Sequence, residues 1–270
     1  MRAATVQSGS ENEPVNYGKW QRWLGGSDWP DLLGLVSPKL FDVISAGAMA
    51  RQAAELARNY LDPASFARTR GLVSERLSRS GLGITLRDPW TSPGPGGWDR
   101  PEAVLRLYFY QLFSGGEALL DLRRRSFSRQ RGALVWDPNP LYVKWHPAFL
   151  RQIRALYSGF YDADDRKYRT ALEDLGIFPA EALFREHFGG NHTRATRFAV
   201  ENFRRTFHRA FALCQQAKTQ LHPNFVPLGI CLAGLYRHLE QMGGAYDVLT
   251  AFNDARARAR ATPESTQNGS

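Results

Sequence analysis

The stretch from Leu221 to Gly244, LHPNFVPLGICLAGLYRHLEQMGG, most constrains what this chain can fold into. Its apolar residues cover most of the circumference of a helix, which is typical of a helix inside a packed bundle or a membrane. The stretch is too short, and too interrupted by Pro227 and Arg237, to span a bilayer. The glycine pair at its end is a helix stop signal. We therefore expect a buried helix at the centre of a bundle.

The composition indicates a soluble chain with enough material for a core. At 270 residues and 43% hydrophobic, it can form one large domain or two small ones. It has no long uncharged apolar run and no apolar run near its N-terminus, so neither a transmembrane helix nor a secretory signal is expected. Cys214 and Cys231 occupy apolar helical positions, which favours free buried thiols in a reducing cytoplasm over a disulfide. A cytoplasmic location follows as an expectation.

The chain is basic, with a net charge of +9, and only five of its 35 basic residues are lysines. Such a surplus can attract nucleic acid, anionic lipid or phosphorylated small molecules. The densest run of arginines lies within residues 123–131. We interpret it as a solvated or ion-paired surface rather than a nucleic-acid interface, because no fold with aromatic base readout is indicated.

Apolar spacing predicts helices over most of the chain, so the fold class is mainly α: a bundle of about eight helices with one small β-hairpin. Ser37-Pro38 and Asp62-Pro63 are start signals, each a capping residue before a proline. The β-prone runs 133–136 and 141–145 flank a Pro-rich turn and predict the hairpin. The expected helical stretches, ten when the short ones at 117–125, 164–175 and 179–188 are counted, are 37–61, 62–81, 99–113, 117–125, 147–160, 164–175, 179–188, 193–221, 221–244 and 246–259.

The domain organisation follows from these patterns. We expect a disordered segment over residues 1–14, a helical hairpin subdomain over 15–81 and a main helical domain over 100–260. Residues 82–99 are rich in proline and glycine, which predicts a connecting loop or a lid. Residues 261–270 form a polar tail that we expect to be disordered.

Signatures of catalysis are missing from the sequence. No glutamate is followed three residues later by a histidine, and no Cys-x-x-Cys or His-Glu-x-x-His is present, so no metal site is predicted. Nucleophile elbows and Walker loops are absent too. A helical enzyme would instead need histidines that meet a carboxylate in one pocket. The candidates are His192, His208, His222 and His238 with Glu186, Glu201 or Glu240.

One loop has features that suit an anion. The sequence Gly-Gly-Asn-His-Thr-Arg at 189–194 leads into the expected helix 193–221. Open backbone N–H groups at a helix start, together with Arg194 and Arg197, could converge on a phosphate or carboxylate. The alternative is an ordinary glycine turn with a helix N-cap.

Four segments in the second half of the chain occur in a suggestive order. They are EAVLRLYFYQLFSG (102–115), GALVWDPNPLYVK (132–144), AFLRQIRALYSGFYDADDRKYRTALEDLGIF (148–178) and the run 224–243. Over roughly residues 100–245 they resemble the C-terminal lobe of the UbiB/AarF family of atypical kinases. The first is similar to the helix before the family's catalytic loop, and the last to its final helix.

This resemblance implies roles for three residues and also shows where the chain departs from the family. In the segment LLDLRRRSF, Asp121 would match the family's catalytic aspartate. Further along the chain, Asp137 would match the metal-binding aspartate and Lys144 the lysine that follows it. The loop has no counterpart of the family's asparagine, and Pro-Asn-Pro stands where Phe-Gly is expected. The Lys-x-Gly-Gln signature and the nucleotide lobe are missing from residues 1–100. The resemblance thus implies a related fold with eroded phosphoryl-transfer chemistry.

Three functions are consistent with the sequence. The first is a non-catalytic or accessory protein that holds a small apolar, isoprenoid-like molecule in a cavity of about 300 Å³ or more, or binds a partner protein, with a homodimer left open. The second is a helical enzyme that acts on a small hydrophobic substrate through His and Glu acid–base or metal chemistry. The third is residual nucleotide binding, with Asp121, Asp137, Lys144, Arg194 and Arg197 as candidate ligands.

Overall fold

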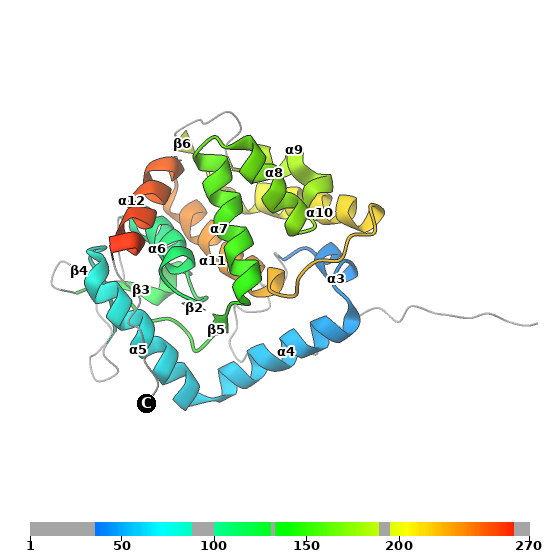
Figure 1. Ribbon diagram of the computed structural model, residues 1–270. Helices are drawn as coiled ribbons and strands as arrows, with labels where there is room; N and C mark the ends of the chain where they lie inside the picture. The colour runs from blue at the N-terminus through cyan, green and yellow to red at the C-terminus, as the bar shows by residue number, and fades with distance from the viewer. Residues whose placement is uncertain (1–35, 88–99, 131–132, 189–194, 262–270) are drawn as a thin grey trace, which may run out of the picture.

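The computed structural model describes residues 36–87, 100–130, 133–188 and 195–261 (Figure 1). Within these ranges the chain forms ten α-helices and seven short strands, so the prediction of a mainly α fold is confirmed. None of the described helices is both long and apolar enough to cross a bilayer. The expected disordered ends, most of the loop 82–99 and the anion-binding turn 189–194 lie outside the described residues.

The two most buried helices form the centre of the molecule, and the other helices surround them (Figure 1). The prediction of a buried helix within 221–244 is confirmed, and its partner is the apolar helix that starts at Pro101. The helices are α3 (Lys39–Asp42), α4 (Ala46–Leu61), α5 (Pro63–Ser80), α6 (Pro101–Ser114), α7 (Pro147–Tyr161), α8 (Asp165–Asp174), α9 (Glu181–His187), α10 (Val200–Gln216), α11 (Phe225–Met242) and α12 (Val248–Ala261).

Side-chain caps fix where several helices begin. Asp62 accepts hydrogen bonds from the N–H groups of the second and third residues of α5, as its Asp-Pro sequence predicts. Asp164 caps α8 in the same way. The expected single helix 37–61 is wrong, because Ser45 caps a separate start and the chain is split into α3 and α4. Gly81 and Gly243 end α5 and α11 with positive φ angles.

The predicted hairpin is also wrong, although both β-prone runs are strands. β4 (Ala133–Trp136) pairs antiparallel with β3 (Phe127–Gln130) and parallel with β1 (Ile84–Leu86), whereas β5 (Tyr142–Lys144) pairs with β2 (Glu117–Leu119). The turn between β4 and β5 bonds elsewhere: the Asp137 N–H donates to the Ser126 carbonyl. The third pair joins β6 (Ala195–Thr196) and β7 (Tyr246–Asp247).

The expected helix 117–125 is replaced by β2 and an extended loop. The side-chain amide of Gln111 on α6 makes two hydrogen bonds to the backbone of Leu119, as a neighbouring strand would. The Gln111 Nε2 donates to the Leu119 carbonyl, and the Leu119 N–H donates to the Gln111 Oε1. Leu119, Leu120 and Leu122 are all buried, so the segment is apolar on both sides. This segment passes through the core, and its carbonyls and N–H groups are satisfied partly by side chains and partly by the backbone of β5 and Leu141.

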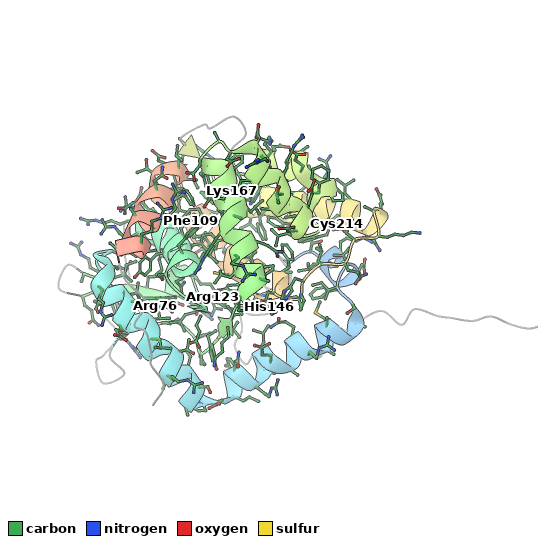
Figure 2. The ribbon with its side chains drawn as sticks, in the orientation of Figure 1. Arg76, Phe109, Arg123, His146, Lys167 and Cys214 are labelled. Atoms are coloured by element: carbon green, nitrogen blue, oxygen red, sulfur yellow. The ribbon has the colours of Figure 1, made fainter. Side chains whose placement is uncertain are left out.

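Aromatic side chains join the central helices to those around them. The ring of Phe109 on α6 lies edge-on to Tyr157 and Tyr161 of α7 and to Phe252 of α12, with centroids 5.3, 6.0 and 5.4 Å apart. Phe109 is labelled in Figure 2. Cys214 and Cys231 are buried and free, as predicted. Residues from α3, α4 and α5 belong to the same apolar core as α6 and α11.

One close helix contact yields a stability prediction. A Cβ on Gly159 of α7 would lie 2.5 Å from the backbone nitrogen of Tyr168 in α8 and 2.7 Å from its Cα. Backbone cannot move aside as a side chain can, so Gly159→Ala is expected to lower the free energy of unfolding by about 2 kcal/mol. The matched control is Gly71→Ala on α5, where nothing lies within 4 Å of the added Cβ.

Gly71→Ala should instead raise the free energy of unfolding by about 0.5–1 kcal/mol, because alanine favours the helix. Urea denaturation of both variants measures the two changes. A gain of stability in both would show that α7 and α8 do not approach each other as closely as the structure has them.

Candidate functional site

Asp121 is the most enclosed charged residue among the candidates. Its side chain has no exposed surface, and it forms a bidentate ion pair with Arg123, at 2.7 Å to Nε and 2.9 Å to Nη2. The Ser126 hydroxyl donates to the carboxylate at 2.7 Å, and the Asn139 N–H donates at 3.1 Å. Trp136 donates its indole N–H to the Asp121 carbonyl. We call residues 121–126, with Asn139, the Asp121 loop.

The electrostatics of the Asp121 loop favour the carboxylate form. Burial raises the pKa of the Asp121 carboxyl, but the hydrogen bonds and charge of Arg123, with those of Ser126 and Asn139, outweigh burial. The pKa is therefore lowered from its ordinary value. The ion pair lies within the fold, where removing either partner would leave an uncompensated charge.

A buried histidine supports this loop from α11. The Nδ1 atom of His238 lies 2.9 Å from the carbonyl oxygen of Leu122, so the neutral ring donates this hydrogen bond from Nδ1. The ring also packs against Phe127, with centroids 5.3 Å apart. Burial, and less so the charge of Arg124, lower the pKa of His238 to about 4, against the effect of the Leu122 carbonyl. His238 thus holds the loop as a neutral side chain.

The two other residues that the family resemblance singles out are paired separately. The Asp137 carboxylate forms an ion pair with Arg87 at 3.1 Å and is 44% exposed. Lys144, at the end of β5, lies 3.6 Å from Glu117 of β2, with which it is in register. Asp121, Asp137 and Lys144 therefore each have a different partner, and no single side chain joins them.

The candidate acid–base residues do not meet in one pocket among the described residues. His208 is exposed and contacts Ser37, Glu201 pairs with Arg204 at the surface, and Glu240 accepts a bond from the N–H of Val200. Glu186 and Arg197 are exposed. His192 and Arg194 lie outside the described residues. His222 packs against Phe149 and lies near His146, with ring centroids 5.1 and 5.0 Å apart.

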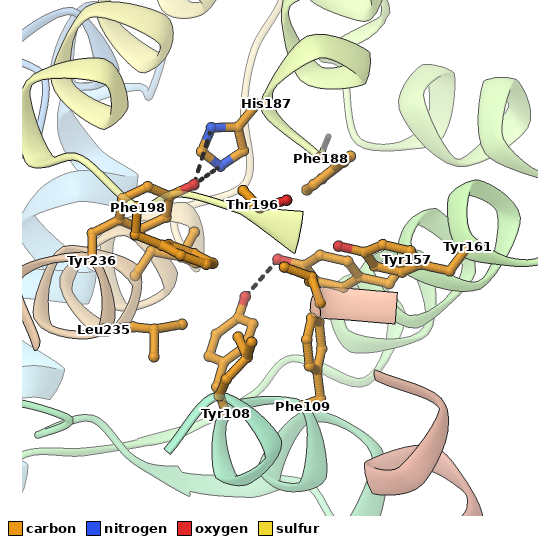
Figure 3. A pocket seen from close by; sticks show the side chains of 13 residues that line it. Tyr108, Phe109, Tyr157, Tyr161, His187, Phe188, Thr196, Phe198, Leu235 and Tyr236 are labelled. Atoms are coloured by element: carbon orange, nitrogen blue, oxygen red, sulfur yellow. Dashed lines mark hydrogen bonds between the residues drawn. The ribbon is translucent and has the colours of Figure 1, made fainter. Parts of the chain in front are cut away.

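His187, which is not among the candidates from the sequence, lines a small interior pocket (Figure 3). The hydroxyl of Tyr236 lies 3.0 Å from its Nε2 and 3.3 Å from its Nδ1. Burial lowers the pKa of His187 to about 4. On the facing helices, Tyr108 and Tyr157 bond through their hydroxyls at 2.6 Å (Figure 3). The pocket has a volume of about 30 Å³, which is the space of one or two water molecules.

The described residues form a mainly α protein in which a buried acidic residue, Asp121, is held by neighbouring residues of the same chain. Within the described ranges, no three His, Cys, Asp or Glu side chains gather as a metal site would require. No protein-family model matches the chain, and no curated protein matches its sequence at a significant level. The function proposed below therefore rests on the geometry of the described residues.

Proposed function

We propose that this chain is a non-catalytic accessory protein, built on a kinase-like lobe, that acts by binding a partner at its surface. The observation that carries the proposal is the state of Asp121. Its carboxylate is fully buried and is engaged by Arg123, by the Ser126 hydroxyl and by the Asn139 N–H. Such a carboxylate serves as a structural anchor.

The spacing of residues in the Asp121 loop supports a kinase-like origin. In protein kinases a catalytic aspartate is followed five residues later by an asparagine that binds Mg²⁺, and a second metal-binding aspartate comes after a further strand pair. Here Ser126 stands five residues after Asp121, and Asp137 follows the β3–β4 pair. If the relationship proposed here holds, a serine stands at the position where the kinases have the asparagine.

The residues at these positions do not fit a nucleotide-bound metal. A general base must reach the substrate hydroxyl within about 3 Å, and the side chain of Asp121 has no exposed surface. The Ser126 hydroxyl donates to Asp121, and Asp137 is paired with Arg87. These observations support a role of the acidic residue in stability rather than in phosphoryl transfer.

The size of the interior pocket bears on what the protein binds. Sites for drug-sized ligands have volumes of about 300 Å³ or more, and the pocket beside Tyr236 has about 30 Å³. An isoprenoid-like molecule would not fit there. We therefore place binding on the surface, which favours the partner version of the hypothesis over a carrier with a ligand in this pocket.

The test is a phosphoryl-transfer assay with Mg-ATP, read as ADP formation and as labelling of the protein or of added acceptor protein. We expect no turnover above background from the wild-type chain, and no rise in Tm at millimolar Mg-ATP that depends on Asp137. Turnover that disappears in Asp137→Asn, an exposed position where folding is not at risk, would overturn the proposal. A Tm rise without turnover that also disappears in Asp137→Asn would instead favour residual nucleotide binding at Asp137.

A further inference from the structure

A second, larger hollow lies against α4 and the end of β5. It is an open groove of about 600 Å³ between α4, the end of β5 and the segment that leads into α11. We call it the α4 groove. His146, at the start of α7, is labelled in Figure 2 beside α4. The side chains that matter here are Arg51, Gln52, Arg58, Lys144, His146 and His222.

The charges in the α4 groove are mainly positive. Arg51 and Arg58 are seven residues apart, so they lie on one face of α4 about 10 Å from each other. Both are exposed, and neither forms an ion pair within the part of the chain that the structure describes. Lys144 adds a third cation, which Glu117 approaches only at 3.6 Å. Glu55 is the one acidic side chain that lines the groove.

The floor of the groove is a buried polar framework built on Asn224. Its Oδ1 accepts from the His146 N–H at 2.8 Å, and its Nδ2 donates to the Gln52 Oε1 at 2.9 Å. Gln52 is only 3% exposed, and its Nε2 has no hydrogen-bond partner among the described residues. A buried donor without an acceptor costs stability, so this framework is held in place by the contacts around it.

His222 adds a second donor to this floor. Its Nδ1 accepts from the N–H of Asn224 at 3.1 Å, so the neutral ring carries its proton on Nε2. The ring is fixed against Phe149, with centroids 5.1 Å apart. The groove thus combines the fixed ring N–H of His222 with two exposed arginine side chains, and arginine binds phosphate oxygens in a bidentate manner.

We propose that the α4 groove binds a small molecule that carries phosphate, with Arg51 and Arg58 on its oxygens and the His222 ring donating a further hydrogen bond. The separation of the two arginines fits a ligand with more than one phosphate group. The volume fits a molecule of the size of a sugar phosphate or a nucleotide. This site is independent of the Asp121 loop, so the inference does not depend on the kinase-like origin proposed above.

The test is isothermal titration calorimetry with pyrophosphate, at constant ionic strength, on the wild-type chain and on the double variant Arg51→Gln/Arg58→Gln. Both positions are exposed, so the variant keeps its fold. We expect saturable 1:1 binding to the wild type and at least a tenfold weaker Kd for the double variant. Arg209→Gln, an exposed arginine on α10, is the matched control and should change the Kd less than twofold.

Three results would overturn the inference. The first is that pyrophosphate shows no saturable binding. The second is that Arg209→Gln weakens pyrophosphate binding as much as the double variant does, because that would indicate a general effect of net charge. Citrate, titrated in parallel, could bind more tightly than pyrophosphate, which would assign the groove to carboxylates. Each of these leaves the Asp121 proposal standing, because that proposal is tested by phosphoryl transfer.

Discussion

Replacing Asp121 with asparagine is expected to lower the free energy of unfolding by about 3–5 kcal/mol, because it removes one partner of a buried ion pair. The Arg123 guanidinium, whose side chain is 5% exposed, would lose the carboxylate that it binds through Nε and Nη2. The asparagine would also present an NH₂ group where the Ser126 hydroxyl and the Asn139 N–H now donate. Urea denaturation, followed by circular dichroism, measures the loss.

The matched control is Asp137→Asn, which breaks another aspartate–arginine pair in the same part of the fold. This pair is 44% exposed at the aspartate and 22% at Arg87. Exposed pairs contribute about 0–1 kcal/mol, so the control should lose little stability. Equal losses in the two variants would show that Asp121 is not the anchor that the structure indicates, and would reopen a catalytic role for it.

The contribution of Asp121 to the free energy of unfolding depends on pH in a different range from that of the histidines. Its pKa is lowered in the folded state, so its contribution is present above the ordinary aspartate pKa of about 3.9 and is lost as the pH falls through the folded value. No part of this contribution is lost between pH 7 and pH 5. Any loss of stability in that range must come from other groups.

The helices that the sequence predicts well are those with strong local signals. α11 and α6 are apolar nearly all round, and such a pattern can be recognised in the sequence without knowing which elements pack against it. The start of α5 needs only Asp62, whose carboxylate bonds N–H groups two and three residues later. These interactions lie within a few residues of one another, so the sequence contains them directly.

The errors occur where distant residues decide the structure. The run Leu119–Leu122 has helical propensity, but Gln111 and the strand β5 capture its backbone, and neither is visible from the run itself. The same holds for the predicted hairpin, because its turn residue Asp137 bonds to Ser126. Long-range pairing of this kind overrides local propensity.

The candidate site shows the same division. The family resemblance singled out Asp121, but the sequence does not reveal that Arg123, Ser126 and Asn139 close around its carboxylate. His187 was passed over because its partner, Tyr236, is 49 residues away. The only local signal was its setting beside Phe184 and Phe188, which could have indicated a buried ring.

His238, which is buried, and His187, which is partly exposed, are expected to make the protein lose stability as the pH falls from about 6.5 to about 4. Burial lowers the pKa of both His187 and His238 to about 4, whereas an unfolded chain has the ordinary value of about 6.5. Below pH 6.5 the unfolded state binds protons that the folded state does not, so stability falls with pH. For fully buried His238 the loss reaches about 3 kcal/mol at pH 4. His187, which is partly exposed, adds a smaller share.

His238→Asn isolates one of the two contributions. Asparagine can place an NH₂ group near the position of Nδ1 and donate to the Leu122 carbonyl, but it does not titrate in this range. Urea denaturation measures the free energy of unfolding from pH 7 to pH 4.5. The change in this free energy over the range should be at least halved in His238→Asn and unchanged in His208→Asn, where the histidine is exposed. An unchanged dependence in His238→Asn would contradict the burial of a neutral ring.

The position of His238 gives this acid response a structural consequence. Its ring bonds to Leu122, the residue that follows Asp121, so protonation acts on the Asp121 loop. The pKa of Asp121 is below its ordinary value, so its ion pair with Arg123 is intact at the pH where His238 begins to oppose folding. Acid should therefore weaken the contact between α11 and the loop before it weakens the ion pair. Amide hydrogen exchange, corrected for the intrinsic exchange rate at each pH, should show this as lower protection factors for Leu122 and Arg123 at pH 5 than at pH 7, with unchanged protection factors in α8.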